Sequence, residues 1–280
     1  YGPLRTMTER IAPGAVADPP PMPSLPRAVL CGLGCLAAAL FGIALSRQPD
    51  SVAAIWLPNA LLLAVALRAP YAQLGPVLGA GMLAIFAANL LGGQDAGPSA
   101  GYTVANLLSV LVPLLWLRRD GQPPFVLADR SGRAAQLLLA VVAGTALSAL
   151  AGGMLLAIMH GVGLHSAITR WLASDLMGMV AVLPLGLRAS LREWRSWTVQ
   201  GRHGEAAALY AMCTVGTLAS LYLSPFPFVT IELPLLIAAL RLGMNGTALL
   251  CAYETVLFAL SVWGGPRPLP ELTVLHSYGP

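Results

Sequence analysis

Apolar runs long enough to cross a lipid bilayer recur along this chain, from about residue 28 to residue 263. Only 10% of its 280 residues are charged and 57% are hydrophobic, whereas a soluble domain carries about 25% charged residues. A helix of about 20 apolar residues spans the hydrocarbon core of a bilayer. The sequence therefore predicts an all-α, polytopic transmembrane helical bundle, with the lipid bilayer as its immediate surroundings.

We expect about nine spans and three regions along the chain. Residues 1–26 are polar and Pro-rich, which predicts a disordered tail. Residues 27–263 form the membrane domain, and residues 264–280 form a polar stretch. A cleaved signal peptide is an alternative reading of the first span. The approximate bounds of the nine spans are 28–46, 52–67, 72–91, 102–117, 134–159, 166–187, 206–223, 228–240 and 244–263.

The distribution of arginine predicts the orientation. All sixteen basic residues are arginine, and thirteen of them fall on the cytoplasmic side when the N-terminus is cytoplasmic. Cytoplasmic loops carry an excess of Lys and Arg, so we expect a multi-pass protein of a bacterial inner membrane. Topology thus accounts for the net charge of +4, and no nucleic-acid partner is needed. Nine spans leave the C-terminus outside, so we expect the chain to continue into a final span and a cytoplasmic output domain.

Polar side chains within the spans predict a site. A charged side chain at the bilayer centre costs about 2.5–3.5 kcal/mol on insertion scales and usually faces the bundle interior. The polar residues come from separate spans, yet each falls in the outer or middle part of its own span. We expect them to form a pocket that opens toward the outside. The residues assigned to it are Trp56, Pro58, Asn59, Asn89, Asn106, Arg170, Trp171, Asp175, Glu232 and Glu254.

Several of these residues also have purely structural readings. Arg170 and Asp175 are about 140° apart around a helix, so each needs a partner on another span. Glu232 is the best candidate for Arg170, either as an ion-pair clasp between helices or as part of a pocket wall. Pro58, placed within a spanning helix, predicts a kink that either shapes a cavity or is an ordinary feature of membrane helices. Asn89 and Asn106 are typical of hydrogen bonds between helices.

No catalytic or metal-binding motif is present. The chain has no phosphate-binding loop, HExxH or GxSxG sequence, so we expect no enzyme, no metal and no cofactor. The four cysteines lie in apolar segments and are typical of packing residues. Asp175, Glu232 and Glu254 could instead form the proton path of a small secondary transporter or proton-coupled channel, although no inverted repeat accompanies them. A membrane anchor without a sensing role is a third reading.

Four segments resemble the membrane-associated sensor domains of the first type. Residues 55–64 carry Trp-Leu-Pro-Asn-Ala, similar to the W-P-x-x-G/N-A signature, although Leu57 separates the Trp from the Pro. Residues 170–178, together with Pro184, are similar to the W-x-x-x-D-x-x-G segment. Residues 79–89 and 239–243 resemble the third-span and A-L-R-F-G motifs. The resemblance covers residues 30–263, nearly all of the membrane part.

The resemblance implies an integral-membrane sensory input domain of a bacterial signal-transduction protein. Such domains regulate a cytoplasmic output in cis, such as a cyclic-di-GMP enzyme or a histidine kinase. By this analogy the chain detects a small ligand or a membrane-protein partner. A homodimer is one alternative for its assembly. The positions that match shared family features are Trp56, Pro58, Asn59, Asn89, Trp171, Asp175 and Gly178.

Overall fold

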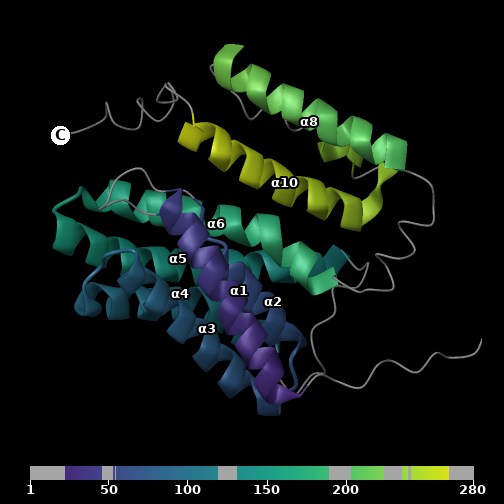
Figure 1. Ribbon diagram of the computed structural model, residues 1–280. Helices are drawn as coiled ribbons and strands as arrows, with labels where there is room; N and C mark the ends of the chain where they lie inside the picture. Colours follow the sequence, from purple (N-terminus) through teal and green to yellow (C-terminus); the bar gives the residue numbers. More distant parts are fainter. Residues whose placement is uncertain are drawn as a thin grey trace, which may run out of the picture.

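The computed structural model describes residues 23–45, 53, 55–118, 131–188, 203–223, 235–238 and 241–264, and these ranges contain helices and no strand. The all-α prediction is therefore confirmed for this part of the chain. Figure 1 shows the helices, whose bounds are α1 Ser24–Ala44, α2 Pro58–Arg68, α3 Tyr71–Leu91, α4 Ala96–Leu117, α5 Ser131–His160, α6 Leu164–Arg188, α8 His203–Leu223 and α10 Gly243–Gly264.

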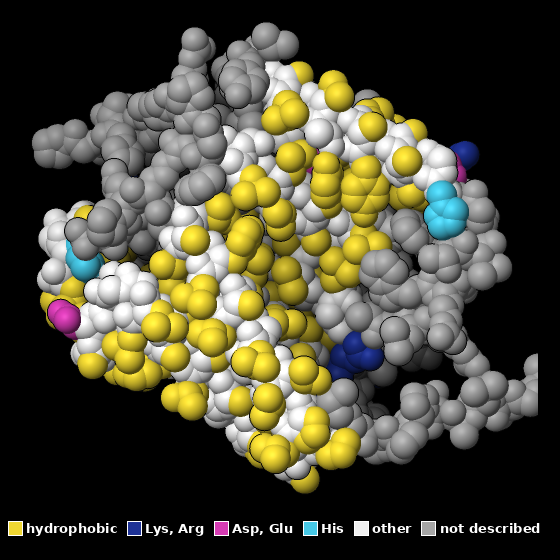
Figure 2. Space-filling model, in the orientation of Figure 1, with side chains coloured by type: hydrophobic (Ala, Val, Ile, Leu, Met, Phe, Trp, Pro, Cys, Tyr) yellow, Lys and Arg dark blue, Asp and Glu magenta, His cyan; other side chains and the backbone are white. Residues whose placement is uncertain are grey.

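Five helices (α1, α3, α4, α5 and α6) are long and apolar enough to cross a membrane. At a rise of 1.5 Å per residue, the 21 residues of α3 and the 22 of α4 extend about 32 Å, close to the hydrocarbon thickness of about 30 Å. Large apolar side chains such as Leu33, Leu83 and Leu115 are exposed, and Figure 2 shows hydrophobic side chains across the whole described face. The protein is thus a multi-pass membrane protein.

The nine predicted spans are not all present as long helices. The second one contains only the 11 residues of α2, and most of predicted span 228–240 lies outside the described residues. The prediction that Pro58 kinks a spanning helix was wrong, because residues 55–57 are not helical and Pro58 is the first residue of α2. At this position proline interrupts no hydrogen bond and its fixed φ favours helix initiation.

The short helix α2 lies at the centre of the bundle. It contacts α1, α3, α4 and α6. Its apolar residues Leu62, Leu63 and Leu67 are fully buried and belong to the largest core cluster. A helix that is hydrophobic on all sides is typical of a buried position. The longer helices therefore screen α2 from lipid.

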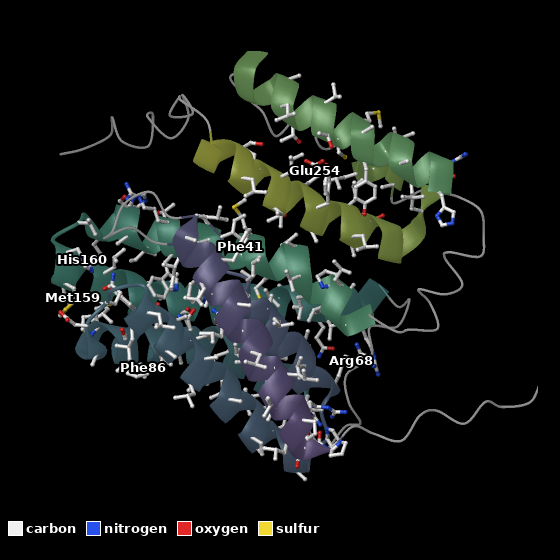
Figure 3. The ribbon with its side chains drawn as sticks, in the orientation of Figure 1. Phe41, Arg68, Phe86, Met159, His160 and Glu254 are labelled. Atoms are coloured by element: carbon white, nitrogen blue, oxygen red, sulfur yellow. The ribbon has the colours of Figure 1, made fainter. Side chains whose placement is uncertain are left out.

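The remaining helices pack around this centre in pairs. Helix α4 packs on α5, α1 on α3, and α5 on α6, while α10 packs against α6 and α8 packs on α10 (Figure 1). Figure 3 places His160, the last residue of α5, and Arg68, the last residue of α2, at opposite ends of the bundle. The bundle axis thus runs between these two residues.

Candidate functional site

Three polar side chains from separate helices meet inside the bundle. The Asn59 Nδ2 of α2 donates to the Asp175 Oδ1 of α6 at 3.0 Å and to the Asn106 Oδ1 of α4 at 2.7 Å. The Asn106 Nδ2 in turn donates to the Tyr102 carbonyl oxygen at 2.8 Å. Asn59, Asn106 and Asp175 are 0%, 3% and 1% exposed. We call these three residues the polar network.

The polar network lies close to the middle of helices α4 and α6. Asp175 follows the first residue of α6, Leu164, by eleven positions, and Asn106 follows the first residue of α4, Ala96, by ten. At 1.5 Å per residue both lie about 15–17 Å from the helix starts, or roughly half the thickness of the hydrocarbon core. The network is therefore deeper than a pocket confined to the outer half of the bundle.

The backbone just before α2 is held tightly against α6. The Trp56 N–H donates to the Ser174 carbonyl oxygen at 3.1 Å. A Cβ added to Gly178 would lie 1.9 Å from the Trp56 carbonyl oxygen, so only glycine allows this approach. Non-helical backbone at membrane depth is tolerated where protein buries it and satisfies its polar groups. Ser174 and Gly178 thus fix the position at which α2 begins, next to Asp175.

Trp171 forms a second contact layer, one helical turn before Asp175. Its Nε1 donates to the Ser148 Oγ of α5 at 3.1 Å, and its ring centroid lies 5.5 Å from that of Tyr102 on α4. The Tyr102 hydroxyl is hydrogen-bonded to the His160 Nε2 at 3.1 Å. His160, the last residue of α5, therefore belongs to this layer. Trp171 therefore joins α4, α5 and α6 beside the polar network.

The other predicted site residues do not share these hydrogen bonds. Arg170 is exposed on α6. Asn89 is buried near the end of α3, and Glu254 bonds to Thr217 between α8 and α10 (Figure 3). Glu232, its expected pairing with Arg170 included, lies outside the described residues. The structure thus brings together part of the predicted set.

Arg118 has a role that the sequence did not reveal. Its guanidinium is buried and its Nη1 donates to the carbonyl oxygens of Ala66 at 3.1 Å and Ala69 at 2.7 Å, at the C-terminus of α2. The guanidinium lies 4.0 Å from the centroid of the Tyr71 ring, and the Tyr71 hydroxyl donates to the Arg118 carbonyl oxygen at 2.7 Å. In the sequence, Arg118 counted as one of the loop arginines that predict the orientation. No sequence pattern indicated that it caps the C-terminus of α2.

The two ends of α2 therefore have groups of opposite charge. Asp175 lies at the N-terminal end and Arg118 at the C-terminal end. This arrangement complements the helix dipole, which is positive at the N-terminus and negative at the C-terminus. The position of α2 along its own axis is thus coupled to both groups.

The polar network has unused hydrogen-bonding capacity. The Asp175 Oδ2 and the Asn59 Oδ1 are buried and form no hydrogen bond. Ser109 of α4 lies beside the Asp175 carboxylate, yet its buried hydroxyl also lacks a regular hydrogen bond. In the described part of the chain, no group of three His, Cys, Asp or Glu residues could hold a metal ion.

The comparison with protein families shows to which family this helical bundle belongs. The MASE1 family, a membrane-associated sensor domain, matches residues 27–268 and so covers the helices described above except for the first three residues of α1. No curated protein matches the chain, and no solved structure matches it. The resemblance seen in the sequence motifs is confirmed, and MASE1 is a non-catalytic input module. The chain belongs to the MASE1 family of integral-membrane sensor domains.

Proposed function

We propose that the polar network of Asn59, Asn106 and Asp175 is the sensing core of this domain. A small ligand or a membrane-protein partner would alter the network and thereby regulate a cytoplasmic output in cis, either a cyclic-di-GMP enzyme or a histidine kinase. One observation carries the proposal: the buried carboxylate of Asp175 is hydrogen-bonded to the first turn of α2, and α2 contacts four other helices. Ionisable groups buried at membrane depth are functional candidates by default.

Helix α2 is suited to transmit a change at the network. Its 11 residues span about 16 Å, from Asn59 to the end where Arg118 caps its last carbonyl groups. At that same end the Arg68 Nη1 donates to the Gly186 carbonyl oxygen of α6 at 2.8 Å. A ligand that binds differently to two positions of α2 would shift the balance between them. With a cytoplasmic N-terminus, the arginine end of α2 faces the output domain.

The remaining predicted residues take different parts in this proposal. Trp56 is bonded through its backbone N–H to Ser174, next to Asp175, and Trp171 lies one helical turn before Asp175 on α6. The hydrogen bonds of the described residues link Asp175 to Asn59 and not to Asn89, Arg170 or Glu254, and Glu232 lies outside the described residues. A role of these four residues as ligand contacts therefore stays a prediction.

The proposal predicts that Asp175→Ala changes signalling without preventing insertion. The basal activity of a reporter output fused to the 280-residue chain should change by about fivefold or more, as expected for a coupling energy of at least about 1 kcal/mol. Thr145→Val is a matched control, since the Thr145 hydroxyl is buried on α5 but bonds only to its own helix. Equal reporter activity in Asp175→Ala and wild type, at equal membrane levels, would contradict the proposal.

The transporter alternative gains no support from the described contacts. Asp175 and Glu254 share no hydrogen-bond partner there, because Asp175 bonds to Asn59 and Glu254 bonds to Thr217. A transporter should move a substrate in liposomes without any output domain. A mere anchor should be replaceable by an unrelated membrane segment without loss of regulation.

A further inference from the structure

Among the residues that the structure describes, no basic side chain is hydrogen-bonded to the buried Asp175 carboxylate. It is 1% exposed, and its hydrogen bond comes from a neutral amide, Asn59. The described arginine side chains of the three helices around it lie elsewhere: Arg68 and Arg118 at the far end of α2, and Arg170 exposed on α6. An isolated carboxylate in an apolar interior is strongly destabilising unless a positive charge compensates it. One positive charge from beyond the described side chains would compensate this carboxylate.

The unpaired atoms around Asp175 are mainly oxygens. They include the Asp175 Oδ2, the Asn59 Oδ1 and the Ser109 Oγ, all buried and without a hydrogen bond of regular geometry, although Ser109 lies beside the Asp175 carboxylate. Ser174 adds a fourth such oxygen one residue before Asp175. The Trp56 Nε1 is also buried and unpaired. Carboxylate, amide and hydroxyl oxygens are the ligands of hard cations.

The chain geometry at this point also favours a cation. A non-helical segment, residues 55–57, meets α6 at the depth where α2 begins. In transporters, interrupted helices near the midplane supply polar backbone and side-chain groups to small ions. A single carboxylate balances one positive charge, whereas a divalent ion would leave an excess charge in the bundle. Asp175 is moreover the sole carboxylate that the described contacts place in the network.

From these observations we infer that the polar network binds a monovalent metal cation, Na⁺, through the Asp175 Oδ2, the Asn59 Oδ1 and the Ser109 Oγ. This inference rests on the proposed function and names the ligand class of the same site. Bound Na⁺ would hold α2 and α4 against α6, because Asn59, Ser109 and Asp175 come from these three helices. Loss of the ion would release the start of α2 from α6.

The test is the thermal stability of the purified 280-residue chain in lipid nanodiscs. NaCl is compared with choline chloride at equal ionic strength and pH. In the wild type, Na⁺ at about a hundredfold excess over Kd should raise Tm by about 5 °C or more. Ser109→Ala should shift the Na⁺ concentration at half-effect upward by about tenfold, and Asp175→Asn should abolish the Na⁺ response. Thr145→Val, which removes a buried hydroxyl outside the network, should respond as the wild type does.

Three results would overturn the inference. One is an equal Tm in NaCl and choline chloride for the wild type. Another is an unchanged Na⁺ response in Ser109→Ala, a variant that keeps the carboxylate and tests the site even if Asp175→Asn does not fold. The third is a Tm that depends on pH through Asp175 but not on Na⁺. This result would show that a proton, and not Na⁺, neutralises the Asp175 carboxylate. The reporter assay is independent: if Asp175→Ala shifts the output while Na⁺ has no effect, the sensing core stands and the sodium assignment falls.

Discussion

Gly178 is the residue with the least room for a side chain among the described glycines. A Cβ there would lie 1.9 Å from the Trp56 carbonyl oxygen, so Gly178→Ala must push the start of α2 away from α6. We expect a loss of about 1–3 kcal/mol in the free energy of unfolding, as for other overpacked core positions. Denaturation by SDS in mixed micelles would measure this loss.

Gly79→Ala on α3 is the control for this prediction, because a Cβ there would meet no atom within 4 Å. Alanine also favours the helix relative to glycine by about 1 kcal/mol, so this control should be neutral or slightly more stable. A stable Gly178→Ala variant would show that the Trp56 backbone does not lie against α6.

Single residues differed in how well the sequence predicted them. Because a charged side chain is costly in hydrocarbon, we expected Asp175 in the interior, and it is buried there. The angle between Asp175 and Arg170 around the helix predicted that they do not pair, and Arg170 is exposed. The partners of Asp175 could not be predicted, since many polar residues share a similar depth. Depth alone does not give the rotation of each helix, and that rotation selects Asn59 and Asn106 while leaving Asn89 and Glu254 elsewhere.

Among the helices, α2 departs most from its sequence pattern. An apolar run of membrane length predicted a full span, but hydrophobicity cannot distinguish a lipid-facing span from a short helix surrounded by others. Pro58 also fits both the first position of a helix and the middle of a kinked one. The non-helical residues 55–57 are stabilised by tertiary contacts with α6, which no local pattern records.

Arg118 should contribute to the stability of α2 as its C-terminal cap. Arg118→Met removes the donors to two buried carbonyl groups and the contact with the Tyr71 ring. Leaving buried acceptors unpaired costs about 1–3 kcal/mol, and we expect a loss of that size in the free energy of unfolding. Arg27→Met is the control: Arg27 makes a partly buried hydrogen bond with Gln73, which contributes about 1 kcal/mol or less. Equal losses in the two variants would refute the capping role.

For the whole molecule, the arginine distribution predicts which end of the bundle faces the cytoplasm. Arg68, Arg118 and Arg133 lie at the ends of α2, α4 and α5 that this distribution assigns to the inside. The opposite end has the exposed residues Asp95, before α4, and His165, at the start of α6. Composition thus sufficed for the membrane class, whereas the orientation stays a prediction from the charge distribution.

Labelling with a membrane-impermeant maleimide would test this topology in intact spheroplasts. Asp95→Cys and His165→Cys should be labelled from outside, and Arg133→Cys only after permeabilisation. Three of the four native cysteines, Cys31, Cys35 and Cys213, are buried and Cys251 is partly buried, so the chain without an added cysteine measures the background. The reverse labelling pattern would show that the positive-inside bias misled the orientation.

The most direct measurement of the sensing role is an exchange of the carboxylate and the amide between Asn59 and Asp175, which are 3.0 Å apart. The basal output of the reporter fusion is compared among Asn59→Asp, Asp175→Asn and the double variant at equal membrane levels. Each single variant should shift the output by about fivefold or more, because it leaves the pair with two carboxylates or with none. The double variant should return toward the wild-type output, since it restores one carboxylate beside one amide. Wild-type output from both single variants would contradict a sensing role for this network.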